Sequence, residues 1–212
     1  MRALAILGLL ILAGCAGVSI PGVGTWWPGG GPATVRMDAA AWDFRYGVGT
    51  PAHPAPAPVG FTFQFPASGE VDYLTTNVSI NAKTIAHAVV KVEAVSGTPA
   101  FKATDGCTPA AFRIMLEARD DDGRNVDKRW WARLNGPALS APGNYVMDVS
   151  LTDLTQWSNV QGTIATVRPN NFRDAIANLG AVGITFGACA FGHGVSVTGG
   201  TARMTVTEFT VQ

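Results

Sequence analysis

The chain has 212 residues, of which 47% are apolar and 14% charged, and its 15 basic and 15 acidic side chains cancel to a formal net charge of +0. This length and apolar content suit one sizeable domain with a substantial core. The balanced charge argues against a nucleic-acid partner, which would call for a basic stripe. It also argues against a charged polymer captured by long-range attraction.

The first fifteen residues have the pattern of a secretory signal. Arg2 supplies a positive start, and residues 3–12 form an apolar run of about ten, far short of the roughly 20 that span a bilayer. The run ends in LAGC, residues 12–15, which resembles the lipobox of bacterial lipoproteins. The resemblance implies cleavage before Cys15 and acylation of its thiol and new amine. More than one acyl chain is what stable anchoring needs. An ordinary signal peptide containing a cysteine is the alternative.

The residues after Cys15 predict where the chain is sorted and how it is attached. Ala16, in place of an aspartate, favours the outer membrane of a bacterial envelope. The Gly- and Pro-rich stretch that follows has no charge and no periodicity, which is typical of a tether. Its Trp26 and Trp27 either rest on the bilayer interface or fold back onto the domain. We therefore expect a signal peptide over 1–14, a lipidated cysteine and tether over 15–34, and a folded domain over 35–212.

Short segments with period-two alternation of apolar and polar residues dominate the rest of the chain. Such segments at this spacing are typical of a β-sandwich. The prolines of 47–58 exclude a central strand there, so a long loop is expected. We predict an all-β, two-sheet antiparallel sandwich whose strands include segments within 61–65, 86–95, 112–120, 144–153, 181–187 and 193–212.

The last of these segments predicts two local features. Gly199 and Gly200 favour a hairpin turn, with strands on either side. Beyond it the apolar positions run 202, 204, 206 and then 209, 211, and this one-residue slip predicts a β-bulge near Thr207 and Glu208.

One segment has helical periodicity. Phe172, Ile176 and Leu179 are spaced i, i+4 and i+7, Asn170 or Asn171 suits the N-cap, and Gly180 follows the end. The pattern predicts a short helix over 171–179 that connects strands.

Cys107 and Cys189 remain once Cys15 is set aside. An exported chain enters an oxidising compartment, where a remaining pair of thiols is most simply a disulfide. Two separately buried thiols are the alternative. A zinc site is disfavoured because neither cysteine has a Cys or His at ligand spacing.

Three stretches carry a resemblance to a known group of proteins. RIMLEARDDDGRNVDKRWWA, LTDLTQWSNVQG and the segment from NNFRDAIANLG to the end resemble exported bacterial jelly-roll domains, which are similar to galactose-binding-like folds and carbohydrate-binding modules. The resemblance covers roughly residues 100–212. It implies a non-catalytic β-sandwich that binds glycan.

The segment KRWWARL, residues 128–134, holds the best ligand-site candidate. In a strand, Trp130, Ala132 and Leu134 share the core-facing phase, so Trp131 is expected to face outward between two guanidiniums. An exposed indole beside forked donors suits a sugar ring, whereas a cation–π stack that merely covers the sheet is the alternative. The partner strand should present its polar face on the same side. The candidate ligand-binding residues are Trp131, Arg129, Arg133, Arg113 and Glu117, with Arg119 further along the same polar face.

The acidic stretch RDDDGRNVD, residues 119–127, is a weak calcium candidate. Asp120, Asp122 and Asp127 supply carboxylates, but the spacing departs from an EF-hand loop. A solvated hairpin turn with Asp-Gly at its tip explains the same residues. We therefore expect no cofactor, with calcium as the exception to test.

No motif in the chain predicts catalysis. There is no nucleophile elbow and no phosphate-cradling loop, and the histidines lie in no metal or triad pattern. Sequence cannot place two carboxylates at glycosidase spacing, the candidates being Glu70, Asp72, Glu93, Glu117 and Asp148. We therefore expect a membrane-anchored, non-catalytic sandwich that binds carbohydrate. The alternatives are a structural or assembly lipoprotein that binds another envelope protein, and, less favoured, a glycosidase or esterase.

Overall fold

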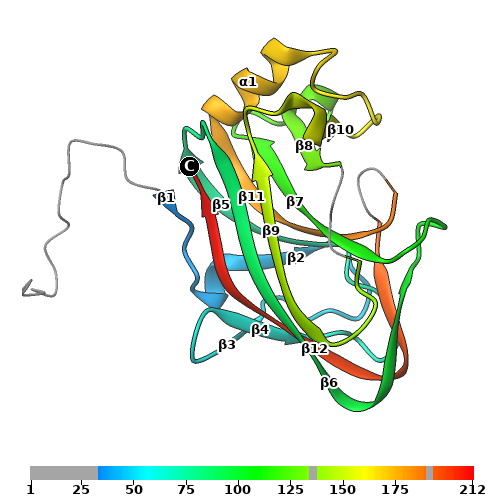
Figure 1. Ribbon diagram of the computed structural model, residues 1–212. Coiled ribbons are helices and arrows are strands. Elements are labelled where there is room, and N and C mark those ends of the chain that lie inside the picture. The colour runs from blue at the N-terminus through cyan, green and yellow to red at the C-terminus, as the bar shows by residue number, and fades with distance from the viewer. Residues whose placement is uncertain (1–32, 134–137, 190–192) are drawn as a thin grey trace, which may run out of the picture. The chain divides into compact units, whose positions relative to one another are not determined.

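Two antiparallel β-sheets make up most of the structure. The computed structural model describes residues 33–133, 138–189 and 193–212. Within these ranges each sheet has six strands, and the two sheets lie face to face (Figure 1). Their inward side chains form one apolar core. The predicted all-β, two-sheet antiparallel sandwich with one short helix is therefore confirmed. The predicted signal peptide, Cys15, the tether up to residue 32 and Leu134 lie outside the described residues. The last two residues of the predicted tether, Ala33 and Thr34, instead form a short strand of the sandwich.

The first sheet, sheet A, has the strand order β3-β4-β12-β6-β9, with β1 added at the C-terminal end of β12. Within the predicted loop 47–58, β3 is a two-residue strand at the edge of the sheet, where a proline without an N–H is tolerated. The strands are β1 (Ala33–Thr34), β3 (Ala55–Pro56), β4 (Phe61–Gln64), β6 (Ile85–Ala103), β9 (Gly143–Ser150) and β12 (Val195–Val211).

The second sheet, sheet B, has the order β10-β8-β7-β11-β5-β2. Its strands are β2 (Trp42–Arg45), β5 (Tyr73–Ile80), β7 (Ala111–Ala118), β8 (Arg129–Ala132), β10 (Trp157–Asn159) and β11 (Leu179–Gly187). Three single 3₁₀ turns, η1 (Ala39–Ala41), η2 (Val126–Lys128) and η3 (Leu154–Gln156), lie in the described connections.

Aromatic rings fill much of the core between the sheets. Trp42 of sheet B meets Phe61 of sheet A with ring centroids 4.7 Å apart, and Phe65 lies 5.9 Å from Phe186. All four side chains are at most 1% exposed. Rings of this size bury the largest apolar area per residue, so the inward faces of the two sheets supply the main driving force for folding.

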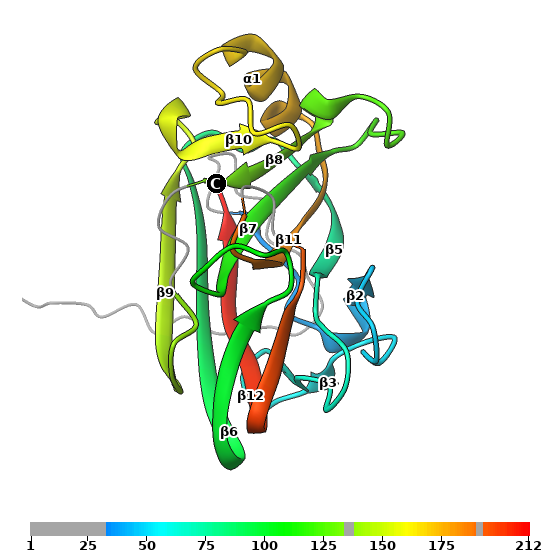
Figure 2. The same cartoon turned by 90° about the vertical axis from the view of Figure 1, so that its right-hand side faces the viewer.

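The α-helix of the described residues, α1 (Pro169–Ala177), covers one end of the sandwich above β8 and β10 (Figure 2). Phe172 packs against Trp130 and Trp157, with centroids 5.2 and 5.5 Å away. The predicted helix is confirmed, but it begins two residues early because Pro169 occupies the first turn, where its missing N–H costs nothing. The predicted asparagine caps are wrong, because the N-cap is Arg168. Leu179 and Gly180 already belong to β11.

Strand β12 corrects the predicted hairpin at Gly199 and Gly200. The chain does not reverse there: β12 stays paired with β6 from Val195 opposite Ala103 to Val211 opposite Ala86. The glycines instead allow a register shift and a close approach to Gly97, where an added Cβ would lie 2.6 Å from the Gly199 carbonyl oxygen. The paired ribbon curves at this point (Figure 1). The predicted bulge is confirmed, because the register shifts again between Val206 and Glu208.

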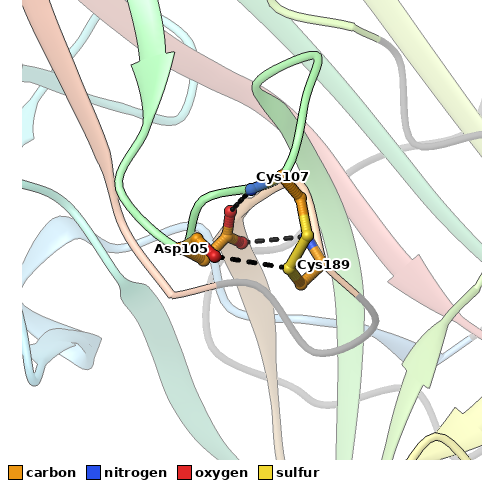
Figure 3. A group of neighbouring side chains, drawn as sticks. All are labelled: Asp105, Cys107 and Cys189. Atoms are coloured by element: carbon orange, nitrogen blue, oxygen red, sulfur yellow. Dashed lines mark hydrogen bonds between the residues drawn. A yellow bond between two sulfur atoms is a disulfide. The ribbon is translucent and has the colours of Figure 1, made fainter.

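Cys107 and Cys189 form the predicted disulfide, which joins the loop after β6 to the segment after β11 (Figure 3). The Asp105 carboxylate lies beside it and accepts hydrogen bonds from the backbone N–H groups of Cys107 at 3.1 Å, Ala188 at 2.7 Å and Cys189 at 2.9 Å. Burial alone would raise the pKa of Asp105, but these hydrogen bonds more than offset it and hold the pKa below its usual value. The carboxylate therefore stays ionised and ties both sides of the disulfide together.

Among the described residues, no helix is long and apolar enough to cross a bilayer.

The disulfide should contribute strongly to stability, because it closes a loop with a sequence separation of 82 residues. Replacing both cysteines, Cys107→Ser with Cys189→Ser, is expected to lower the free energy of unfolding by about 4 kcal/mol through greater entropy of the unfolded chain. Guanidinium unfolding measures the change. The wild type under a reducing agent is the control and should match the variant. An unchanged midpoint in both would contradict the prediction.

Candidate functional site

The outer face of sheet B brings together the residues that the sequence singled out around Trp131. Strand β7 pairs with β8 so that Met115 lies opposite Trp131 and Glu117 opposite Arg129. Strand β2 runs along the far side of β5, with Arg45 opposite Tyr73. The expectation that the polar faces of 112–119 and 128–134 coincide is therefore confirmed.

Trp131 itself corrects the predicted exposed ring. It points away from the main core, as its phase predicts, yet it is only 1% exposed. Tyr73, Met115 and Trp131 form a second, smaller apolar cluster on this face, and Val160 packs against it. Period-two alternation shows which face a side chain takes but not whether other segments cover that face. The indole is thus a packing element and offers no open platform for a sugar.

The charged residues around Trp131 are paired with one another. The Glu117 carboxylate lies 3.2 Å from Arg45 Nη1, and Arg129 Nε lies 2.8 Å from Asp121 Oδ2. Arg129 also donates from Nη2 to the Gly123 carbonyl at 3.1 Å, so its guanidinium is tied to the turn after β7. Burial raises the pKa of Glu117, while the charge of Arg45 partly offsets the rise.

Tyr46 supplies the exposed aromatic ring that Trp131 does not. Its residue surface is 75% exposed, and its backbone has φ = +65°, a left-handed conformation that is rare for a bulky side chain. The ring meets Tyr73 edge-on, with centroids 5.5 Å apart and an interplanar angle of 77°. No periodic signal predicts Tyr46. The only sequence hint is its position at the end of a strand, in front of the glycines of 47–49.

These groups surround one small hollow on the outer face. Tyr46, Tyr73 and Trp131 line it together with Arg45, Met115, Glu117 and Arg129. Its volume is about 30 Å³, which is the space of one water molecule. A ligand at this place therefore lies across the surface. We call these seven residues the Tyr46 surface.

The other candidates from the sequence do not line this hollow. Arg113 turns toward the disulfide, where its Nη2 donates to the Ala188 carbonyl at 2.7 Å. Arg119 hydrogen-bonds to Ser79. Arg133 follows β8, and its backbone N–H donates to the Gln156 carbonyl at 2.7 Å. Of the five predicted ligand-binding residues, three line this hollow: Arg129, Glu117 and Trp131.

The acidic stretch 119–127 does not gather its carboxylates into a calcium site. Asp120 pairs with Lys128 at 2.8 Å, and Asp122 accepts from the Arg124 backbone N–H at 3.0 Å. Within the described ranges, the group of three potential metal ligands that lie close together is Asp105, Cys107 and Cys189, and both of those thiols are consumed by the disulfide. The hairpin-turn interpretation explains these residues.

Asp127 has a structural task of its own beneath α1. Its carboxylate accepts from Asn159 Nδ2 at 2.8 Å, Asn171 Nδ2 at 2.7 Å and Arg168 Nη1 at 2.5 Å. Burial raises the pKa of Asp127, but the hydrogen bonds from Arg168 and Asn159 lower it by more, so the pKa lies below its usual value. The network joins η2, β10 and the start of α1, so this carboxylate holds the helix on the sandwich.

Comparison with known proteins adds little to the residue-level description. No protein-family model matches the sequence, and no curated protein matches it. Among solved structures, a chain described as "xylan-binding module CBM15" aligns with a TM-score of 0.44 and 15% identity. The alignment covers 84% of this chain and 99% of that chain. No residue here takes a role from it.

Asp72, next to Tyr73, is the described carboxyl with the most perturbed titration. It is 7% exposed, and its Oδ1 has no hydrogen-bond partner among the described residues. Burial, and to a lesser extent the charge of Glu70, raises the pKa of Asp72 from 3.8 to about 6. The folded chain therefore holds this proton at a pH where the unfolded chain has released it.

The raised pKa makes Asp72 a pH-dependent cost to stability. Below about pH 4 both states are protonated and the cost is absent. It grows as the pH rises through 4 to 6 and reaches about 3 kcal/mol above pH 7. Asp72→Asn should therefore raise the free energy of unfolding at pH 7.5 and change it little at pH 4, as measured by urea unfolding. The exposed Asp174→Asn is the matched control. Equal effects of Asp72→Asn at both pH values would refute the assignment.

Proposed function

We propose that this chain is a non-catalytic carbohydrate-binding protein held at a bacterial envelope membrane through an acylated Cys15. The observation that carries the binding half is the exposed Tyr46 ring beside the Arg45–Glu117 ion pair, where phenol, guanidinium and carboxylate share one open face.

The Tyr46 ring has the properties of a sugar-stacking platform. The apolar C–H face of a pyranose packs on an aromatic face, and neighbouring polar groups then fix its orientation. A left-handed backbone at a bulky residue costs about 1–3 kcal/mol, and a ring that is 75% exposed recovers little of this by burial. Contact between the Tyr46 ring and a ligand would explain why a strained backbone holds this side chain in an exposed position.

The charged neighbours suit hydroxyl groups better than they suit a charged ligand. Arg45 and Glu117 already neutralise each other, and their side chains are 34% and 20% exposed, so donors and acceptors are held in place before a ligand arrives. A preorganised pair of this kind costs little to order on binding. Because Glu117 is engaged by Arg45, we propose that it binds hydroxyls and does not transfer protons. The small hollow favours the side of a polysaccharide chain over an enclosed small molecule.

Tyr46 provides the sharpest test of glycan binding. Tyr46→Ala is expected to weaken binding to a glycan recognised by the wild type by about 10-fold, the loss of one stacking contact of about 1.4 kcal/mol. A glycan array followed by titration calorimetry measures it, with Val48→Ala as the exposed neighbouring control. Trp131→Ala is unsuitable, because removing a buried indole costs about 3–5 kcal/mol of stability.

Tyr46→Gly separates a binding role from a packing role. Glycine adopts φ = +65° without strain, so this variant should be at least as stable as the wild type and yet lose the same binding. The proposal fails if Tyr46→Ala and Tyr46→Gly bind like the wild type. It fails equally if the wild type binds no glycan on the array.

The lipid anchor is supported by the LAGC pattern at residues 12–15 and by the apolar run before it. In a bacterial host, labelled palmitate is expected to enter the wild-type chain, and Cys15→Ser should abolish the label. Cys107→Ser with Cys189→Ser is the control and should keep it. Fractionation of the envelope tests the location, for which Ala16 favours the outer membrane. A label that persists in Cys15→Ser would contradict the anchor.

A further inference from the structure

A groove with a volume of about 390 Å³ lies at the end of the sandwich that α1 covers. Three segments form it: the turn between β5 and β6, the corner that leads from β9 into η3, and the second half of α1. We call it the α1 groove. Its size is within the range of small-ligand sites, and it shares no residue with the Tyr46 surface.

The floor of the α1 groove is apolar. Ala82, Leu151 and Ile176 are buried, and Leu154 is half-buried beside them. The backbone below is already satisfied, because the Ala82 N–H donates to the Ile176 carbonyl and the Leu151 N–H to the Thr84 carbonyl, both at 2.9 Å. The floor thus offers hydrocarbon contact, while the exposed Asn81 and Thr152 add polar groups at the edge of the groove.

The rim of the α1 groove is cationic. Lys83 and Arg173 are exposed, and neither makes an ion pair with a carboxylate among the described residues. No aspartate or glutamate lines the groove. Arg173 Nη1 lies 3.4 Å from Asn170 Oδ1, a contact between neighbours on one helix. The groove therefore combines two positive charges that make no direct ion pair within the described ranges with an apolar floor, which is complementary to an anionic amphiphile.

The chain enters the domain beside this groove. Strand β1 pairs with the end of β12, Ala33 opposite Val211. The carbonyl of the next residue, Gln212, accepts from the backbone N–H of Lys83 at 2.7 Å. Both views place the C-terminus toward the same end as α1 (Figures 1 and 2). Residues 16–32 span at most about 60 Å when fully extended, so an anchor at Cys15 holds this end of the domain within reach of a bilayer.

We propose that the α1 groove binds an anionic phospholipid of the membrane to which the chain is anchored. The phosphate lies between Lys83 and Arg173, and the glycerol and upper acyl carbons lie on Leu151, Leu154 and Ile176. This inference rests on the anchoring half of the proposed function and is independent of the glycan half. Such a contact would hold the domain in one orientation, with α1 toward the bilayer.

Vesicle sedimentation of the unacylated mature chain tests the groove. Residues 15–212 carrying Cys15→Ser are mixed with phosphatidylcholine vesicles or with vesicles that also contain phosphatidylglycerol. The unacylated chain is expected to sediment with the anionic vesicles and to stay in the supernatant with the neutral ones. Lys83→Glu with Arg173→Glu should weaken binding about 10-fold or more, because two attractive charges become repulsive.

The matched control is Lys102→Glu with Arg124→Glu, which gives the same net charge from exposed sites outside the groove. It should bind nearly as well as the parent, and equal melting temperatures of both double variants would show that folding is intact. Equal losses in the two variants, or equal binding of the parent to both kinds of vesicle, would overturn the proposal. Displacement of the protein from vesicles by inorganic phosphate, at constant ionic strength, would assign the rim to free phosphate and also overturn it.

The proposed anchor and the proposed lipid site are tested by independent experiments. Palmitate labelling reports on Cys15 alone, whereas the sedimentation assay uses a chain that cannot be acylated. If palmitate labels the wild type but the unacylated chain does not bind anionic vesicles, the anchor is supported and the groove proposal is wrong.

Discussion

Sheet B buries apolar side chains on both of its faces, and this constraint decides what the rest of the molecule can present to a ligand. Its inner face meets sheet A through rings such as Trp42 and Phe186, while its outer face carries the cluster of Tyr73, Met115 and Trp131. Because the outer cluster is covered, the exposed aromatic ring of this face lies at the margin of the sheet. There Tyr46 leaves the end of β2 and extends its ring into solvent.

The fold was largely predictable because period-two alternation shows which side chains of a strand share the face turned toward the core. Strand β7, with Phe112 and Ile114 inward, shows the pattern clearly, and the predicted bulge at Glu208 followed from a slip in the same pattern. Strand β5 escaped prediction because four successive residues from Tyr73 to Thr76 are buried, two of them threonines, so no alternation remains. The pair Gly199–Gly200 was ambiguous for a different reason: a tight reversal and a close strand crossing both require residues without a Cβ.

The candidate site was predictable only in part, since exposure depends on segments far away in sequence. The phase of Trp131 and the shared polar face of the two strands follow from the local pattern. The position of Glu117 opposite Arg129 depends on the register between β7 and β8, which the pattern leaves open. The packing of Val160 against the cluster that contains Trp131 does not follow from local pattern. Tyr46 depends on one backbone angle at a strand end, and the α1 groove depends on three segments that meet only after folding. Sequence periodicity carries no information about contacts between segments that are distant in sequence.

The carboxylate of Asp105 has a consequence for how the two disulfide-linked segments are held together. It accepts backbone hydrogen bonds from both Cys107 and Cys189, and these bonds need no sulfur chemistry. The loop after β6 and the segment after β11 are therefore linked twice, once by the covalent bond between the sulfurs and once through a half-buried carboxylate.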